Sequence, residues 1–393
     1  MPIDRRGTRR PVVGRDDELQ EFALALDAAA RGLPSVLLVA GDPGIGKSTL
    51  VAEAAARSGS PAFLGRCVHV GGDAIPLAPL VDLVRQILRR AEDEPATDDA
   101  TPPSRSALSA LAELVSDLQT RASTSRPVDV FELARAAAAE LGASEPVLFG
   151  FEDLHWGDAA SWDVFEYLAR NLIDEHVVLV ATYRPDEVAR DPSLRRRVAE
   201  LVRIPGVKRI TLTGLDRTAI AHHAAAVLGI PPPRSLVDEL VRRSAGNPFF
   251  VEELVAAHVA GERIPSLLSE LLEADIAELD ASTRLVVGAI AAVGRDTDPA
   301  MLTEIVGLDE RAIDDAVRAA VDARLVVVDA DTDAYRVRHP LIGEVAYAAL
   351  LPSERRRLHA AIAEALRSTP RYALTATDAA GELAFHLDRA GDE

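Results

Sequence analysis

The feature that most constrains this chain is the segment Gly41-Asp42-Pro43-Gly44-Ile45-Gly46-Lys47-Ser48, which fits the pattern GxxxxGK followed by Ser or Thr. It lies between an apolar run at residues 36–40 and a helix-prone stretch at residues 49–57. A glycine-rich turn in that setting points successive backbone N–H groups inward and adds the positive end of the helix. The segment therefore predicts a phosphate-binding loop, in which Lys47 contacts the β- and γ-phosphates and the Ser48 hydroxyl ligates Mg²⁺.

Composition and charge narrow the class of protein. The chain has 393 residues, which is enough for two or three domains, and 48% are hydrophobic but only 4% aromatic, which favours helices with Ala, Leu and Val cores. A net charge of −19 argues against broad contact with nucleic acid or an anionic membrane. Cys67 is the only cysteine, so an intrachain disulfide and a zinc cluster are both excluded.

The chain also lacks the usual signals for export or membrane insertion. Residues 1–10 contain arginines but no apolar core of a secretory signal. The longest apolar stretch, residues 285–294, is too short to span a bilayer. We therefore expect a cytoplasmic protein with no membrane partner.

Short apolar runs alternate with helix-prone segments through the first half of the chain. After residues 36–40, the runs are 61–65, 147–151, 177–181 and 210–212. The segments expected to be helical are 17–30, 49–57, 77–89, 107–118 and 128–141. Residues 92–105 are predicted to form a surface loop. This alternation predicts an α/β fold, with a parallel sheet that has helices on both faces and binds ligands at the carboxyl ends of its strands.

The second half of the chain predicts a different organisation. We expect four domains: a P-loop nucleotide-binding domain at 1–215, a helical lid subdomain at 216–280, a winged-helix-like domain at 281–351, and the start of a helical, TPR-like region at 352–393. The winged-helix prediction rests on three short helices followed by alternating runs at 325–328 and 334–337. The last predicted helix ends with the chain, so we expect this chain to be a piece of a larger protein.

Two acids follow one of the predicted strands. The run at 147–151 leads directly into Glu152 and Asp153, and a buried strand that ends in two acids is unfavourable unless a cation or hydrogen bonds compensate them. Nucleotide hydrolysis needs an acid that holds Mg²⁺ and a group that orients the attacking water. We assign Glu152 to the metal and Asp153 to the base; a shift of one residue would reverse these roles.

The next predicted strand ends in Thr182-Tyr183-Arg184. It places Arg184 beside the γ-phosphate, where a charged donor could report hydrolysis; the alternative is an exposed arginine that caps the strand. His155 and Trp156, directly after the acid pair, are first interpreted as packing residues and only second as a link between the site and a partner. Asp158 is predicted to cap the helix that begins at the next residue.

Taken together, these motifs resemble the ATPase portion of the STAND class, specifically the large ATP-binding regulators of the LuxR type, with a P-loop unit of the ASCE or AAA+ kind. The resemblance rests on residues 13–15, 41–48, 151–158, 182–184, 246–254 and 338–341. It implies that Gly14 and Arg15 lie near the adenine and ribose, that Pro248 touches the base, and that Arg184 is the sensor arginine. The nucleotide-binding set is then Gly14, Arg15, Gly41, Asp42, Pro43, Gly44, Ile45, Gly46, Lys47, Ser48, Thr49 and Pro248.

The family resemblance also implies how such a protein works. It implies a switch that is closed with ADP, open and self-associating with ATP, and reset by slow hydrolysis, with Mg²⁺ as the metal. An inducer of unknown identity would act through helical repeats, and DNA would be bound only by a domain that this chain does not contain. Glu152 stands where many members of the family have Asp.

Two other functions fit parts of the sequence. An AAA+ ATPase of the origin-recognition type also places a winged helix after its ATPase unit and would act on DNA. Here the third helix of the predicted winged helix is rich in acids, at residues 309, 310, 314, 315 and 322, which argues against DNA reading. A small-molecule phosphotransferase would need a lid of arginines over the phosphates, and the sequence shows no such set.

Overall fold

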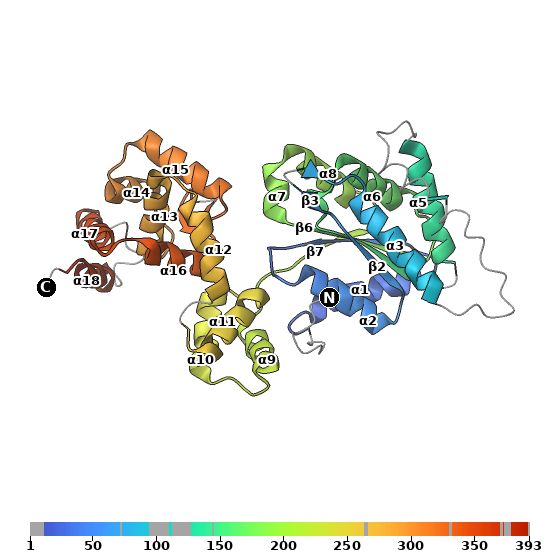
Figure 1. Cartoon of the computed structure of the whole chain (residues 1–393), viewed down its shortest axis with the longest axis horizontal. Coiled ribbons are helices and arrows are strands. Elements are labelled where there is room, and N and C mark those ends of the chain that lie inside the picture. The colour runs from blue at the N-terminus through green and yellow to red at the C-terminus, as the bar shows by residue number, and fades with distance from the viewer. Residues whose placement is uncertain are drawn as a thin grey trace. The chain divides into compact units, whose positions relative to one another are not determined.

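The chain divides into two compact units, Met1–Ala219 and Ile220–Glu393 (Figure 1). This computed structural model describes residues 12–70, 73–93, 110–111, 127–143, 145–262, 266–329, 332–369, 372 and 379–391. Each unit has its own hydrophobic core. The finer division of the second unit, near residues 280 and 351, remains a prediction.

The first unit is built on a sheet of five parallel strands in the order β2-β5-β6-β1-β7. The strands are β1 (Ser35–Ala40), β2 (Ala62–Arg66), β5 (Val147–Glu152), β6 (Val177–Tyr183) and β7 (Val207–Thr211). The predicted α/β fold with a parallel sheet is confirmed. The edge strand β7 begins earlier than predicted, because only Ile210 among its residues is buried, so most of its length carries no apolar pattern.

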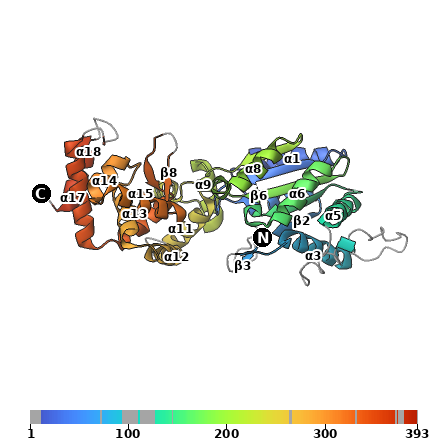
Figure 2. The ribbon, with the colours of Figure 1, turned by 90° about the horizontal axis from the view of Figure 1, so that it is seen from above.

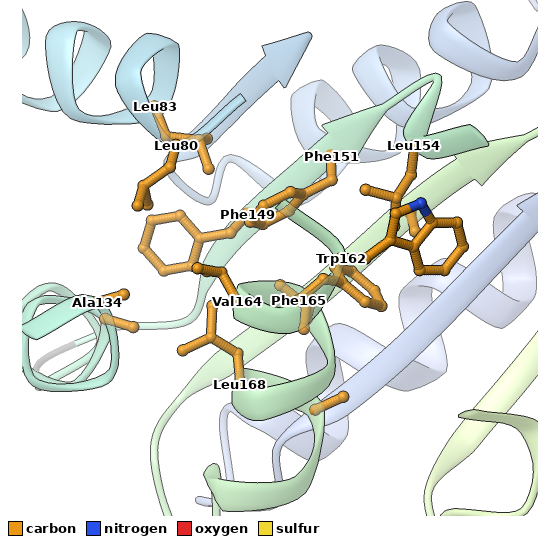
Figure 3. Packing of buried hydrophobic residues seen from close by; sticks show 14 of the residues in the cluster. Leu80, Leu83, Ala134, Phe149, Phe151, Leu154, Trp162, Val164, Phe165 and Leu168 are labelled. Atoms are coloured by element: carbon orange, nitrogen blue, oxygen red, sulfur yellow. The ribbon is translucent and has the colours of Figure 1, made fainter. Parts of the chain in front are cut away.

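Helices cover both faces of this sheet. One face packs against α1 (Asp16–Ala29) and α2 (Lys47–Ser58). The other packs against α3 (Ala78–Asp93), α5 (Pro127–Leu141) and α6 (Ala159–Asn171). Figure 3 shows this second layer, where Phe149 and Phe151 of β5 lie among side chains from these helices, and the rings of Phe151 and Phe165 meet edge to face at 5.3 Å between centroids. Because β5 and β6 are buried on both faces of the sheet, their sequences are continuous apolar runs and do not alternate.

Several short elements of the first unit were not predicted. They are the antiparallel pair β3 (His69–Val70) and β4 (Asp73–Ala74), the 3₁₀ turn η1 (Leu154–Trp156), and the helix α7 (Pro185–Arg190), which is followed by the longer helix α8 (Pro192–Val202). Elements of two to six residues contain too little periodicity to be recognised from a pattern. The loop predicted at 92–105 and the helix predicted at 107–118 lie largely outside the described residues.

The second unit is almost entirely helical. Its helices are α9 (Arg217–Leu228), α10 (Arg234–Ser244), α11 (Pro248–Ala260), α12 (Ser266–Ala277), α13 (Ala281–Val293), α14 (Pro299–Val306), α15 (Glu310–Asp322), α16 (Pro340–Ala349), α17 (Pro352–Ser368) and α18 (Ala379–Ala390). After α15 comes an antiparallel hairpin of β8 (Val326–Val328) and β9 (Tyr335–Val337). The predicted order of three helices and a hairpin is therefore observed at α13 to β9. At the carboxyl end, α17 and α18 pack side by side (Figure 2).

Aspartates start the three helices before the hairpin. The side chains of Asp280, Asp298 and Asp309 each accept hydrogen bonds from backbone N–H groups in the first turns of α13, α14 and α15. Gly294 and Gly307, at φ 75° and 70°, end α13 and α14 in the left-handed conformation that glycine adopts readily. These local signals explain why this region was predictable. Among the described residues, no helix combines the length and the apolar character that crossing a bilayer requires.

Candidate functional site

The predicted phosphate-binding loop joins β1 to α2. β1 ends at Ala40, and α2 begins at Lys47 with Gly46 at its amino-terminal cap. Gly44 and Gly46 have φ angles of 74° and 101°, which a residue with a Cβ rarely adopts. The loop thus has the strand-loop-helix setting that the sequence predicted, and α2 directs its positive end at the loop.

The amine of Lys47 lies at the start of this loop. Its Nζ donates to the carbonyl oxygens of Gly41 at 2.8 Å and Asp42 at 3.0 Å, and the residue is only 8% exposed. Burial lowers the pKa of Lys47, while the negative charges of Asp153, Asp42 and Asp186 oppose that shift. A buried ammonium that is only partly compensated is favourable where an anion completes its surroundings.

The two predicted acids take different positions at the end of β5. Glu152 is the last residue of the strand and is 5% exposed; its Oε2 accepts from Arg66 Nη2 at 3.1 Å. Within the described part of the chain, Glu152 Oε1 is buried without a hydrogen-bond partner. Asp153 leaves the strand with φ 54°, and its backbone N–H donates to Thr182 Oγ1 at 2.9 Å. The left-handed turn at Asp153 ends the alternation of the strand, so the two side chains cannot be placed by strand periodicity.

The sheet order brings Arg184 to the phosphate-binding loop. β6 lies beside β1 with Tyr183 opposite Ala40, and Gly41 N–H donates to the Tyr183 carbonyl at 3.3 Å. Arg184 is the next residue, and its positive charge lowers the pKa of Lys47. The structure therefore brings Lys47, Asp153 and Arg184 together at the carboxyl ends of β1, β5 and β6.

Gly14 and Arg15 lie against the same loop from another side. Arg15 is 5% exposed, and its Nη2 donates to the carbonyls of Thr213 at 2.7 Å and Ile45 at 3.3 Å. Gly14 has φ 65°, and a Cβ there would lie 2.5 Å from the Cβ of Ala219, the last residue of the first unit. Arg15 thus ties the backbone of the phosphate-binding loop to the segment after β7. The contact with adenine and ribose that the resemblance implies remains a prediction.

Pro248 belongs to the second unit and is described within it. Asn247 caps α11 by accepting from Phe249 N–H at 3.1 Å, and Pro248 is the first residue of the helix. The ring of Phe250 lies 3.8 Å from that of His339 between centroids, and His339 Nε2 lies 2.9 Å from the Ser244 carbonyl oxygen. The motifs at 246–254 and 338–341, far apart in the sequence, therefore pack against one another.

The residues around the acid pair behave mostly as the sequence predicted. Asp158 caps α6, accepting from the N–H groups of Ala160 at 3.2 Å and Ser161 at 3.1 Å. His155 is buried, and its ring lies 5.0 Å from that of Trp156. These contacts support the interpretation of this segment as packing around the site.

Sequence reasoning missed Arg66 and Asp186. Arg66 ends β2 opposite Glu152 of β5. The rule that parallel strands end at one edge predicts the shared edge, but only the sheet order makes the two residues neighbours. Asp186 lies in the first turn of α7, a helix that was itself not predicted. Its proximity to Arg184 in the sequence was the available signal.

A cavity elsewhere in this unit is separate from these charges. It has a volume of about 630 Å³ and is lined by residues that include Leu19, Phe22, Arg57, Ser60 and Glu145. Ser60 and Glu145 precede β2 and β5, so the cavity lies at the amino ends of the strands. The site is therefore identified by its charges and loop geometry and not by the size of a hollow.

The residues present fit a magnesium ion bound together with a nucleotide. Ser48 and the two acids are oxygen ligands, which Mg²⁺ prefers, and the buried Oε1 of Glu152 still lacks a partner among the described residues. In the described part of the chain no three His, Cys, Asp or Glu side chains gather into a metal cage. Magnesium held by one or two carboxylates and by phosphates needs no such cage.

Comparison with known proteins agrees with this geometry. The model of the AAA ATPase domain family matches residues 11–180. An uncharacterised protein of Rhizobium meliloti (strain 1021) is 26% identical over 433 residues, which cover 97% of this chain and 39% of that protein. The chain therefore spans well under half of the length of the curated relative it matches.

Solved structures show more distant similarity. The ORC2 protein of Aeropyrum pernix, in ADPNP and ADP complexes, is 14% identical over 88% of this chain and 97% of that one, with a TM-score of 0.49. A STAND protein with a tetratricopeptide repeat sensor from Pyrococcus horikoshii is 15% identical over 100% of this chain and 50% of that one, with a TM-score of 0.37. The AAA ATPase domain model thus matches the part of the chain that holds the loop at 41–48, and that loop joins a strand to a helix as a P-loop does.

Proposed function

We propose that this chain is an ATP-binding and slowly hydrolysing regulatory switch of the STAND type, and that it forms the ATPase portion of a transcriptional regulator. The observation that carries the proposal is the meeting of Lys47, Asp153 and Arg184 at the ends of three strands. A buried lysine, an acid and an arginine at a glycine-rich loop are the groups that phosphoryl transfer uses.

Each residue has a proposed role in this site. Backbone N–H groups of the loop and Lys47 hold the phosphates, Ser48 and Glu152 hold Mg²⁺, and Asp153 orients the attacking water. The Mg²⁺ ion, when bound, neutralises charge on the phosphate oxygens. Arg184 contacts the terminal phosphate, and its loss of that contact after hydrolysis reports the state of the nucleotide.

Slow hydrolysis is supported by how the side chains are held. Glu152 forms an ion pair with Arg66. Arg184 lies over the face of the Trp156 ring and forms a 3.9 Å ion pair with Glu187. These groups must adjust before they act on a bound triphosphate, and such adjustments slow turnover. We propose that hydrolysis resets the switch and that an inducer, still to be identified, opens it.

Calorimetry tests the proposal directly. Protein freed of carried-over nucleotide should release heat on titration with Mg-ATP and with Mg-ADP, and steady-state turnover should be slow. Mass measurements with ADP and with a non-hydrolysable ATP analogue should show a larger assembly with the analogue. The absence of heat with either nucleotide would refute nucleotide binding, and rapid turnover without a partner would refute the switch.

A DNA-acting ATPase of the origin-recognition type is the alternative. It would read DNA through the helices and hairpin at α13 to β9, but α15 carries several acids. Asp315, for example, is 68% exposed and pairs with Arg318 of the same helix. An acidic helix repels the phosphate backbone. We therefore expect no retardation of duplex DNA in a gel-shift titration at low salt, and salt-sensitive retardation would favour the alternative.

A further inference from the structure

The side chain of Arg184 is supported mainly by an aromatic face. Its guanidinium carbon lies 4.5 Å from the centroid of the Trp156 ring, whereas its ion pair with Glu187 is long, at 3.9 Å. The side chain is 15% exposed, and its Nε is buried without a hydrogen-bond partner in the described part of the chain. The guanidinium thus lies over the indole face, and Glu187 adds only a long ion pair.

The position of Trp156 follows from the backbone after the acid pair. The left-handed turn at Asp153 redirects the chain into η1, which ends at Trp156 and packs against β6. The indole therefore comes back to the end of the strand that carries Arg184. This contact joins the strand that bears the acids to the strand that bears the arginine.

Stacking suits an arginine that must meet an anion. A guanidinium on an aromatic face uses its π surface for support and leaves its N–H donors free in its own plane. It also restricts a long side chain before the ligand arrives, which reduces the conformational entropy lost on binding. A carboxylate support would instead occupy the donors that a phosphate needs.

We infer that Trp156 is a positioning residue for Arg184, which it holds stacked so that the N–H edge of the guanidinium meets the terminal phosphate of a bound nucleoside triphosphate. This inference rests on the proposed function and adds a residue to the same site. The sequence predicted Trp156 to be a packing residue, and Arg184 is the side chain on which we infer that it packs.

The test compares nucleotide affinities in variants of Trp156. Trp156→Leu keeps apolar volume but removes the aromatic face, and Trp156→Phe keeps a smaller face. Because Arg184 meets only the terminal phosphate, Trp156→Leu should weaken binding of a non-hydrolysable ATP analogue about fivefold and lower kcat by a similar factor. Affinity for ADP should stay within about twofold of the wild-type value, and Trp156→Phe should be intermediate.

A matched control separates positioning from general packing. Trp162, the other tryptophan, belongs to α6, is buried in the core (Figure 3), and contacts neither the loop nor Arg184 by any described interaction. Trp162→Phe should leave the ratio of ATP-analogue to ADP affinity unchanged. Equal weakening of both nucleotides by Trp156→Leu, or the same ratio change in Trp162→Phe, would show a structural role and overturn the inference.

A double-mutant cycle gives the decisive reading. In an Arg184→Ala background, Trp156→Leu should cause no further loss of ATP-analogue affinity, because the group it positions is gone. Additive losses would overturn the inference. Should Trp156→Leu fail to fold, judged by thermal unfolding, Trp156→Phe carries the same cycle. Wild-type protein that binds neither nucleotide would refute the proposed function itself, and that outcome differs from all of these.

Discussion

Each unit of the molecule buries a polar cluster. The first cluster is built from lysine, aspartate and arginine, and the second from two histidines and a tyrosine. In the first unit, burial lowers the pKa of Lys47, and the charges of Asp153 and Arg184 act on its amine. In the second, His359 Nε2 lies 2.8 Å from Tyr347 Oη, and the Nδ1 atoms of His359 and His386 lie 2.7 Å apart. Burial lowers the pKa of both histidines, that of His386 to about 4, so both rings are neutral near pH 7.

The difference distinguishes a ligand site from a structural one. Neutral groups that bond to one another need no further partner, and the pair between α17 and α18 is complete in this sense. Buried charges are unfavourable unless they are compensated, and the cluster at Lys47 combines a displaced lysine pKa with an unpartnered Glu152 oxygen among the described residues. The first cluster is therefore the one that we expect to bind an ion or an anion.

The largest expected effect comes from removing the lysine. Lys47→Ala should weaken binding of Mg-ATP and Mg-ADP about 100-fold, because a charge-assisted contact to phosphate is lost in a buried site. Calorimetry on nucleotide-free protein measures both affinities. The matched control is Arg57→Ala, which removes a half-exposed cation from the same helix α2, paired there with Glu53. If Lys47→Ala binds as tightly as Arg57→Ala, the cluster is not a nucleotide site.

Neutralising the acids should separate binding from turnover. Glu152→Gln and Asp153→Asn should each retain nucleotide while kcat falls about 100-fold, since one loses a metal ligand and the other loses the group that orients water. Steady-state turnover at several Mg²⁺ concentrations measures both effects.

The same experiment assigns the two roles. The variant whose half-saturating Mg²⁺ concentration rises identifies the metal acid, which is Glu152 in our assignment. Asp163→Asn on α6, whose carboxylate is 46% exposed, is the control. Wild-type turnover in both acid variants would show that the acids only end a strand.

Much of this comparison was predictable from sequence, and the physical reasons are local. The loop at Gly44 and Gly46, the strands buried on both faces, and the helices capped by Asp280 and Asp298 all carry their signals within a few residues. Contacts between segments far apart carry no such signal. The packing of His339 on Phe250 is one example, because it depends on how α16 lies against α10 and α11.

The candidate site divides in the same way. Lys47, Glu152 and Arg184 could be named because each follows an apolar run or a glycine motif. Arg66 could not, since β2 is a short strand with an exposed end and its carboxylate partner is set by pairing with β5. Side chains supplied by tertiary pairing need the sheet order, which the pattern of apolar runs leaves undetermined.

The histidine pair predicts a pH dependence confined to the structural cluster. The pKa of His386 is lowered by burial and then by the charges of His359, Arg295 and Arg389, so the unfolded state binds a proton at higher pH than the folded state does. The stability that this ring contributes is present above its ordinary pKa and is lost as pH falls from about 6.5 towards 4. The loss should be on the order of 1 kcal/mol at pH 5.5 relative to pH 7.5.

Thermal unfolding across that range checks the sign. His386→Gln should flatten the dependence on pH between 7.5 and 5, whatever it does to the melting temperature itself. His258→Gln, at an exposed position on α11, should keep the wild-type slope. An unchanged slope in His386→Gln would mean that the second cluster does not titrate as a buried neutral pair, and the contrast between the two clusters would weaken.

The smallest effect should come from Arg66, which links the charged cluster to the surface. Its side chain is 61% exposed while that of Glu152 is 7% exposed, and such half-exposed ion pairs contribute little to stability. Arg66→Ala should therefore leave the melting temperature nearly unchanged.

The same variant should nevertheless lower the half-saturating Mg²⁺ concentration about twofold, because a buried carboxylate without its arginine binds a cation more strongly. Arg57→Ala, which breaks a comparably exposed pair away from the site, should change neither quantity. A lower half-saturating Mg²⁺ concentration seen only in Arg66→Ala would place Glu152 at the metal. A higher one would instead mean that Arg66 itself helps to hold the phosphates.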